Sequence, residues 1–194
     1  MQTQAQAAPR PRSRRRQKNN ALRDFFGVLR TALLLLLIAI LFLHYVGQRV
    51  RVEGSSMTNT LQDGDQLIMD KLTYRFSEPE RFDIIVFTRS EDDKHYIKRI
   101  IALPGETNRI EDSEIYIDGA LLADPYKKEP HYSAHQAAEP IVLGEDEYFV
   151  MGDNRNGSED SRRNVIGIVK RDRIDGRAIF RIWPLPELGL LTKE

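Results

Sequence analysis

The sequence contains no cysteine among its 194 residues. Disulfide bonds and thiolate metal sites are therefore excluded, and the fold depends on a packed core. Hydrophobic residues make up 41% of the chain and charged residues 30%. This composition allows one domain of roughly 100–150 residues, together with a tail and an anchor. After Val50 the sequence also lacks a convincing helical period, so we expect no long helix there.

Acidic residues are missing from the first 23 residues of the chain. Seven basic residues and no acid lie between Arg10 and Arg23. Beyond Val52 the balance reverses, with 28 acidic residues against 19 basic ones. A basic arm can bind nucleic acid, but this one directly precedes an apolar run. That arrangement is typical of a segment that keeps its N-terminus in the cytoplasm. We therefore predict a cytoplasmic tail over residues 1–24 and no nucleic-acid partner.

The apolar run extends from Thr31 to Val46. This is shorter than the roughly 20 residues that cross a bilayer, but extension back to Phe25 adds only Arg30 as a charge near the helix end. A cleavable signal peptide is the alternative, although no small-x-small site follows Val46. The sequence predicts an uncleaved transmembrane anchor over residues 25–47, in the cell membrane. Residues 48–194 would form a catalytic domain outside the cytoplasm.

This C-terminal part is expected to be mainly β. Short apolar segments alternate with Asp-Gly, Pro-Gly and Gly-Asp turns, as in a β-rich domain. A hairpin turn is expected after Ile117, at Asp118-Gly119. Residues 125–140 are interpreted as a long surface excursion. The six candidate strands are Gln66–Asp70, Asp83–Phe87, His95–Leu103, Glu114–Ile117, Tyr148–Met151 and Ala178–Ile182.

Two residues 42 positions apart suggest a catalytic pair. Ser56 lies in a Gly-Ser-Ser-Met loop, where a serine is ordinarily a simple turn residue. Lys98 lies in an apolar strand, between Tyr96 and Ile100 on one face. Burial there would lower the pKa of the lysine and leave part of it as a free amine, which can activate a serine hydroxyl. The alternative for Lys98 is an edge-strand lysine that prevents aggregation.

A third polar segment, Gly152–Arg162, is too polar for a strand. It could hold the lysine amine through Ser158 and through ion pairs of Asp153 or Asp160 with Arg99 or Arg162. A calcium loop would need a bidentate glutamate at its twelfth position, which this segment lacks. The histidines are too scattered to predict a metal site. We therefore predict no metal and no cofactor.

Taken together, these blocks resemble the bacterial type I signal peptidases, the serine–lysine enzymes that remove signal peptides from exported proteins. The resemblance extends from the anchor to Pro184 and includes Ser56-Met57, Gly64-Asp65, Tyr96 to Glu106 and Gly152 to Arg162. It implies two antiparallel sheets. It also implies a membrane-bound serine endopeptidase that cuts after small residues of the Ala-x-Ala type, with preproteins and the lipid bilayer as partners.

The same resemblance implies roles for individual residues. Ser56 matches the nucleophile, Lys98 the general base, and Ser158 the serine that hydrogen-bonds the lysine amine. The substrate would add a strand along the sheet edge near the lysine. Supporting ion pairs are implied for Asp153, Asp160, Arg99 and Arg162. Small-residue pockets are implied near Met57, Leu61, Tyr96 and Ile97.

The sequence departs from the family pattern at two positions near the nucleophile. Asn59 stands where the family usually has proline, which predicts a less rigid loop. Gly54 stands where some members carry a hydroxyl that helps to hold the oxyanion, which leaves the backbone N–H of Ser56 with a less obvious partner.

Two other functions fit parts of the pattern. A self-cleaving repressor-type protease shares the chemistry, but it carries a DNA-binding helix pair where this chain has the apolar run. A catalytically idle, membrane-tethered β-domain that binds a protein partner is the other. The sequence gives no indication of the oligomeric state.

Overall fold

The computed structural model describes residues 14–89, 94–130 and 133–191. In the first helix, side chains are described for residues 23–40 only. Contacts divide the chain into two units, Met1–His44 and Tyr45–Glu194. Helix α1 spans Arg14–Val46. Among the described residues, no helix is both long and apolar enough to cross a membrane.

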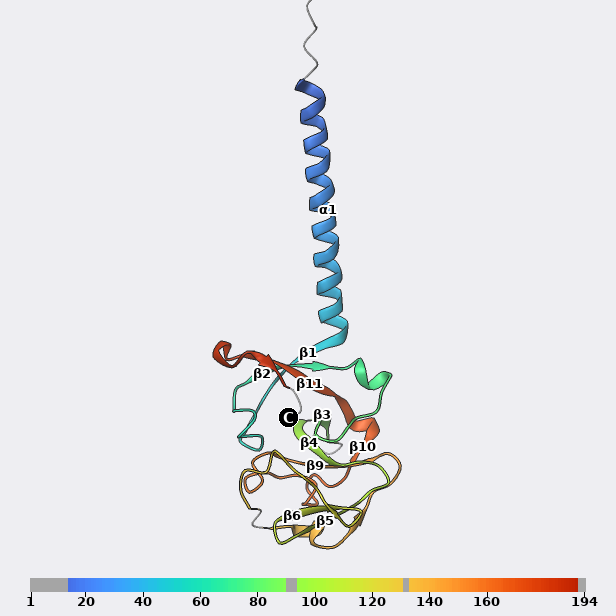
Figure 1. The fold of residues 1–194 in the computed structure, drawn as a ribbon, viewed down its shortest axis with the longest axis vertical. Helices are drawn as coiled ribbons and strands as arrows, with labels where there is room; N and C mark the ends of the chain where they lie inside the picture. The colour runs from blue at the N-terminus through green and yellow to red at the C-terminus, as the bar shows by residue number, and fades with distance from the viewer. Residues whose placement is uncertain (1–13, 90–93, 131–132, 192–194) are drawn as a thin grey trace, which may run out of the picture. The chain divides into compact units, whose positions relative to one another are not determined.

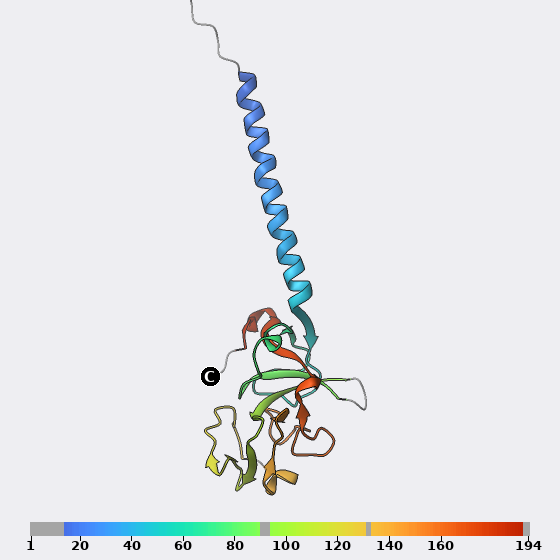
Figure 2. The ribbon, with the colours of Figure 1, turned by 90° about the vertical axis from the view of Figure 1, so that its right-hand side faces the viewer.

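The C-terminal unit is built on a large antiparallel sheet with the strand order β1-β2-β11-β3-β4-β9-β10, and β12 pairs with β11 (Figure 1). Figure 2 shows the same strands from the side. The strands are β1 (Gly47–Arg51), β2 (Gln66–Asp70), β3 (Ile84–Thr88), β4 (His95–Ala102), β9 (Glu147–Met151), β10 (Val169–Lys170), β11 (Ile174–Trp183) and β12 (Gly189–Leu190).

A second antiparallel sheet has the order β7-β6-β5-β8. Its strands are β5 (Thr107–Glu111), β6 (Glu114–Ile117), β7 (Ala120–Leu121) and β8 (Ile141–Val142). The predicted hairpin turn is present, because Ile117 pairs with Ala120 across Asp118 and Gly119. Both turn residues have positive φ, 52° and 80°, as a tight two-residue turn requires.

The prediction of a mainly β domain with two antiparallel sheets is confirmed. All six predicted strands are present, although β11 begins four residues earlier than expected, at Ile174. Strands β1 and β5 were not predicted, nor were the two-residue strands. Within the described part of the chain, the helices after Val46 are single 3₁₀ turns: Thr73–Arg75, His135–Ala138, Arg171–Arg173 and Leu185–Glu187.

Three buried clusters of apolar side chains stabilise this unit. One lies around Met57, Leu61 and Ile97, and a second lies around Ile85, Ile100 and Tyr148. The third joins the two sheets, because it combines residues of β4 and β9 with residues of β5 and β6. Its members are Ile101, Ala102, Ile110, Ile115, Ile117, Ala137, Leu143, Phe149 and Met151.

The predicted excursion, described here except for residues 131 and 132, is not purely a surface segment. Tyr126 is only 6% exposed and Ala137 is fully buried. Both side chains lie where the excursion returns to the body of the domain, so its ends are packed rather than solvated.

Strand β4 positions the candidate site because only part of this strand pairs with neighbouring strands on both sides. It pairs with β3 from His95 to Arg99, whereas its pairing with β9 begins at Arg99. The segment His95–Lys98 therefore has a strand on one side only, within the part of the chain that the structure describes. A bulge between Ile100 and Ala102 interrupts the alternation of faces, which explains why Ala102 packs beside Ile101.

Candidate active site

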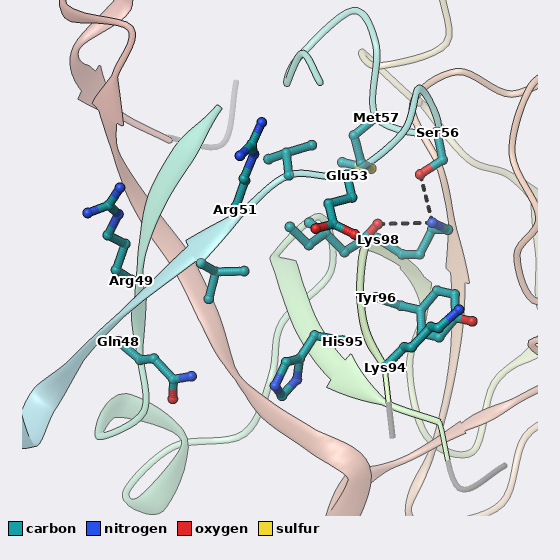
Figure 3. Close-up of a pocket in the computed structure, with 13 residues that line it drawn as sticks. Gln48, Arg49, Arg51, Glu53, Ser56, Met57, Lys94, His95, Tyr96 and Lys98 are labelled. Atoms are coloured by element: carbon teal, nitrogen blue, oxygen red, sulfur yellow. Dashed lines mark hydrogen bonds between the residues drawn. The ribbon is translucent and has the colours of Figure 1, made fainter. Parts of the chain in front are cut away.

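A cavity of about 590 Å³ opens beside the start of β4 (Figure 3). Its walls come from three segments: β1 with the residues that follow it, the loop that carries Ser56, and the start of β4. The lining residues are Gln48, Arg49, Val50, Arg51, Val52, Glu53, Ser56, Met57, Lys94, His95, Tyr96, Ile97 and Lys98.

The serine loop is tied to the polar loop by hydrogen bonds. The backbone N–H of Asn154 donates to the carbonyl oxygen of Ser56 at 3.1 Å. The side-chain amide of Asn154 donates to the carbonyl oxygen of Ser55 at 3.0 Å. Met57, which is 1% exposed, fixes the loop from the other side by packing into the core. The hydroxyl of Ser56 is therefore presented from an anchored turn.

Asn59 modifies the expectation of a less rigid loop. Its φ is +104°, a value that the ring of a proline cannot adopt. Its side-chain amide donates to the carbonyl oxygen of Asp153 at 3.3 Å. The loop is thus tethered by a hydrogen bond at the position where a proline would restrict the backbone.

Lys98 reaches Ser56 directly. Its Nζ lies 2.8 Å from the Oγ of Ser56 and 3.1 Å from the carbonyl oxygen of Ile97 (Figure 3). Lys98 is only 4% exposed, and its Nζ lies 6.0 Å from the centre of the Tyr96 ring. The distance between Nζ and Oγ is within the reach required of a general base.

Burial lowers the pKa of Lys98 from 10.5 to about 8. The charges of Asp160, Glu159 and Asp153 act in the opposite direction and raise it. Desolvation prevails because an ammonium group loses its hydration in the interior, whereas these carboxylates are not in direct contact with it. Near neutral pH, about one tenth of the lysine is then a free amine. This fraction is enough to accept a proton.

Arg99, the next residue in β4, forms a buried ion pair on the opposite side of the strand. Its Nε and Nη2 donate to the two carboxylate oxygens of Asp153 at 2.8 and 2.7 Å. Its Nη1 donates to the carbonyl oxygen of Phe82 at 2.8 Å, and Thr60 donates to Asp153 at 2.5 Å. The pair is therefore bidentate and almost fully hydrogen-bonded.

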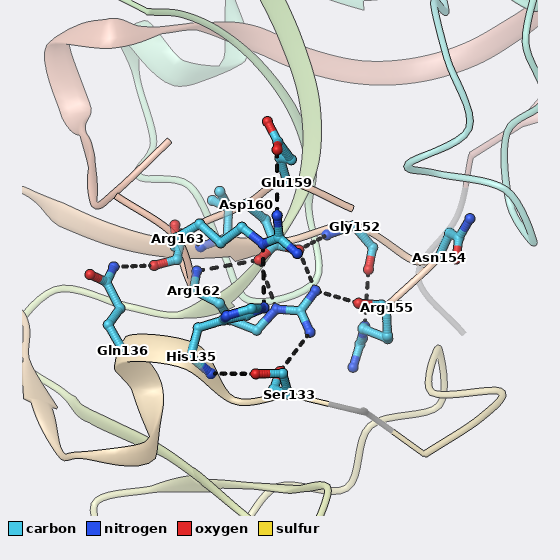
Figure 4. A network of polar contacts seen from close by, with 12 residues as sticks. Ser133, His135, Gln136, Gly152, Asn154, Arg155, Glu159, Asp160, Arg162 and Arg163 are labelled. Atoms are coloured by element: carbon cyan, nitrogen blue, oxygen red, sulfur yellow. Dashed lines mark hydrogen bonds and ion pairs between the residues drawn. The ribbon is translucent and has the colours of Figure 1, made fainter. Parts of the chain in front are cut away.

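The second predicted ion pair joins Asp160 to Arg162 (Figure 4). The guanidinium binds both carboxylate oxygens, at 2.8 and 2.9 Å. Asp160 also accepts the backbone N–H of Gly152 at 3.1 Å. Of the pairings that the sequence left open, the structure thus forms Arg99 with Asp153 and Arg162 with Asp160. Both pairs fix the start of the polar loop behind Ser56.

The expected hydrogen bond from Ser158 to the lysine amine is not formed. Ser158 is 5% exposed, and its Oγ has no hydrogen-bond partner among the described residues. The side chain lies instead against Gly152, where a Cβ would come within 2.3 Å of both the Ser158 Oγ and the Ser56 carbonyl oxygen. The amine of Lys98 contacts the Ser56 hydroxyl and the carbonyl of Ile97 instead.

The structure places three of the four predicted pocket residues in the cavity wall: Met57, Tyr96 and Ile97. Leu61 is the exception. It is fully buried in the core cluster behind Met57 and does not line the cavity. The wall formed by β1 was missed, because that strand was not predicted. Val50 of β1 and Val52, which follows the strand, are both buried and add apolar surface to this wall at alternate positions.

Sequence reasoning also missed a buried ion pair between Arg155 and Asp124, whose Nη1 and Oδ2 lie 2.5 Å apart. Their side chains are 0% and 4% exposed. No sequence signal marks the pair, because the residues lie far apart in the chain. Over the described residues, no three histidine or acidic side chains come together as metal ligands.

Comparison with known proteins gives the family. The family described as "Signal peptidase, peptidase S26" matches residues 25–183. A probable signal peptidase I-2 from Synechocystis sp. is 39% identical over 156 residues, which cover 77% of this chain and 69% of that protein. Signal peptidase I T from Bacillus subtilis is 37% identical over 159 residues, which cover 78% of this chain and 82% of the relative.

Among solved structures, a signal peptidase I from Enterococcus faecalis is 34% identical, covering 52% of this chain and 97% of that one with a TM-score of 0.44. From the sequence matches, the chain belongs to the signal peptidase family, peptidase S26.

Proposed function

We propose that this chain is a serine endopeptidase that removes N-terminal signal peptides from preproteins, with Ser56 as the nucleophile and Lys98 as the base. The observation that supports these two roles is the 2.8 Å contact between Nζ and Oγ at a lysine that is 4% exposed. Relatives that are 37–39% identical carry the name signal peptidase I. A catalytically idle β-domain is not favoured by this membership.

The reaction begins with neutral Lys98. Its amine takes the proton of the Ser56 hydroxyl while the Oγ attacks the scissile carbonyl carbon, and the carbonyl oxygen becomes an oxyanion. Collapse of this intermediate breaks the C–N bond, and the protonated amine of Lys98 gives its proton to the leaving nitrogen. A water molecule, deprotonated by the same amine, then hydrolyses the acyl-enzyme. The backbone N–H of Ser56 is proposed to stabilise the oxyanion together with a second donor other than residue 54, because Gly54 carries no hydroxyl.

The substrate is proposed to bind as an added strand along His95–Lys98. Among the described residues this segment pairs with β3 on one side, its pairing with β9 begins only at Arg99, and its residues line the cavity. Main-chain hydrogen bonds to such a strand edge bind an extended peptide whatever its sequence. Every second side chain of the peptide points to the same face. The apolar residues Val52, Met57 and Ile97 offer shallow contacts there, which supports a requirement for small residues at two alternate positions.

We further propose that residues 25–47 anchor the protein in the cell membrane, with residues 1–24 in the cytoplasm and residues 48–194 outside it. Support comes from the basic tail and from the apolar run, which continues from Thr31 to Val46 within helix α1. Extraction of membranes with alkaline carbonate tests this proposal. A chain released by carbonate contradicts the anchor.

Replacement of the two reacting side chains tests the proposed chemistry. Ser56→Ala and Lys98→Ala, each as the full chain in detergent, should abolish cleavage of a precursor with an Ala-x-Ala site. The matched controls are Ser55→Ala, the neighbouring serine, and Lys170→Ala, an exposed lysine of β10. Both controls should cleave at the wild-type rate. Cleavage that survives in Lys98→Ala would refute the assigned base.

A further inference from the structure

The structure assigns a positioning role to Asp124 and Tyr126, two residues outside the catalytic cavity. We infer that this segment, residues 124–126, holds the two buried arginines on which the geometry of Ser56 and Lys98 depends. The inference rests on the proposed function and extends it to Asp124, the residue before the excursion, and to Tyr126 at its start.

Asp124 contacts the polar loop through Arg155. Its Oδ2 lies 2.5 Å from the Nη1 of Arg155, in a setting where neither side chain is more than 4% exposed. The other oxygen of Asp124 accepts the backbone N–H of Tyr126 at 3.0 Å, which closes a local turn. One carboxylate therefore shapes the segment and also neutralises a buried cation.

Tyr126 contacts the other arginine. The guanidinium carbon of Arg99 lies 3.4 Å from the centre of the Tyr126 ring. The centres of the Phe82 and Tyr126 rings lie 5.4 Å apart. The edges of the same guanidinium are bound by Asp153 and by the carbonyl of Phe82. Tyr126 thus covers the face of a cation whose edges are already fixed, which leaves that cation little freedom to move.

Both arginines lie next to the reacting groups. Arg99 follows Lys98 directly in β4. The Nε of Arg155 donates to the carbonyl oxygen of Gly152 at 3.1 Å (Figure 4). Gly152 in turn lies so close to the carbonyl of Ser56 that even a methyl group would not fit between them. A displacement of Arg155 would therefore also shift Ser56 through Gly152. A displacement of Arg99 would shift Lys98 through the backbone of β4.

This arrangement predicts a specific kinetic effect. Neither Asp124 nor Tyr126 lines the cavity, so substrate binding should be little affected. The rate should fall, because a misplacement of about 1 Å between reacting groups can lower a rate by about a hundredfold. We therefore expect a loss in kcat with an unchanged KM.

The experiment measures kcat and KM of the full chain in detergent on an Ala-x-Ala precursor, with kcat expressed per folded molecule from near-ultraviolet circular dichroism. Asp124→Asn and Tyr126→Leu should each lower kcat about ten- to a hundredfold, with KM within about twofold. Tyr126→Phe, which keeps the ring, should stay within about threefold of wild type. A purely structural role would lower the folded fraction but not kcat per folded molecule.

Two further variants complete the test. Glu114→Gln removes the partly exposed ion pair between Glu114 of β6 and Lys127, the residue after the segment, and should leave kcat unchanged. The double variant D124N/R155Q should be no slower than the slower single variant, because both changes break the same ion pair between Asp124 and Arg155.

The inference is overturned if Asp124→Asn and Tyr126→Leu both keep kcat within twofold of wild type, or if Glu114→Gln is equally slow. If either variant fails to fold, the other decides the outcome. Failure of the inference is separate from failure of the proposed function. Wild-type cleavage that is lost in Ser56→Ala supports the function however the segment variants behave.

Discussion

Lys98 and Arg99 are neighbours in β4, and both are buried, at 4% and 1% exposure, yet their surroundings differ in kind. The amine of Lys98 contacts a hydroxyl and a carbonyl, and no carboxylate lies within ion-pair distance among the described residues. The guanidinium of Arg99 is bound by both oxygens of Asp153 and covered by Tyr126.

The difference separates a reactive group from a structural one. A buried amine without a contacting carboxylate loses its proton easily, because the charged form has lost its hydration and the more distant carboxylates offset only part of that loss. A buried arginine keeps its charge and therefore requires a partner. Alternation along one strand directs the two side chains to opposite faces, so two contrasting environments are separated by a single residue.

The largest effect on kcat is expected when Lys98 is replaced by arginine, the residue type of its neighbour in β4. In Lys98→Arg the side chain cannot release its proton at any accessible pH, so Ser56 is not activated. We expect kcat to fall by about 10³–10⁴-fold, the upper range for loss of a general base. Assays between pH 6 and 10 should show the wild-type rate rising through about pH 8, where the amine loses its proton, and a flat profile for the variant.

Lys170→Arg, at an exposed position, is the control for this substitution and should retain the wild-type profile. The comparison fails if Lys98→Arg keeps more than a tenth of the wild-type kcat at pH 8.

The next largest effect, on the free energy of unfolding, is expected when the carboxylate partner of Arg99 is removed. Asp153→Asn keeps the shape of the side chain but leaves the guanidinium buried without a counter-charge. Breaking one side of a buried pair typically costs about 3–5 kcal/mol of folding free energy. Urea unfolding of the full chain in detergent measures this loss.

The matched control is Glu111→Gln, which breaks an ion pair with Arg109 whose side chains are 42% and 51% exposed. That change should cost less than about 1 kcal/mol, because water screens an exposed pair. Equal losses in the two variants would mean that burial does not distinguish these pairs.

The same contrast shows what could be predicted from the sequence. The six strands with alternating or continuous apolar residues were found, because burial on a sheet leaves a clear pattern. Strand β5, Thr107–Glu111, was missed because Ile110 is its only apolar residue, and the strand is formed through pairing with β6 and β8. Strand β1 was missed for a similar reason, since Arg49 and Arg51 alternate with a single valine.

Within the site, Lys98 could be proposed because a lysine is unusual in an apolar strand, and the two ion pairs because the Gly152–Arg162 loop is dense in charge. Ser56 is an ordinary turn residue by itself and became a candidate only together with Lys98 and the resemblance to the family. Leu61 was misplaced because a core leucine and a pocket leucine look alike in sequence. The contacts of Asp124 and Tyr126 could not be proposed at all. They depend on how the excursion returns to the domain, and this is fixed by tertiary packing rather than by any local pattern.

The smallest effect concerns the free energy of unfolding, which is lowered when the buried Lys98 carries its charge. The pKa of Lys98 is about 8 in the folded chain and has its ordinary value of 10.5 when unfolded. Below pH 8 both states carry the proton, and the folded state bears the cost of a buried charge. Between pH 8 and 10.5 only the unfolded state is protonated, so stability rises with pH across this window.

Lys98→Met removes that cost and should stabilise the inactive protein at pH 7 by up to about 3 kcal/mol, at 1.36 kcal/mol for each pKa unit. The advantage should shrink as the pH rises from 8 to 10.5, because the folded wild-type lysine is then already uncharged and only the unfolded state still carries the proton. Urea unfolding at pH 7 and pH 10 measures the difference, with Lys170→Met as an exposed control that should show no such trend. A methionine variant that is no more stable than wild type at pH 7 would mean that the amine is compensated by contacts as effective as those of Arg99. In that case the contrast between the two faces of β4 would lie in geometry alone and not in charge.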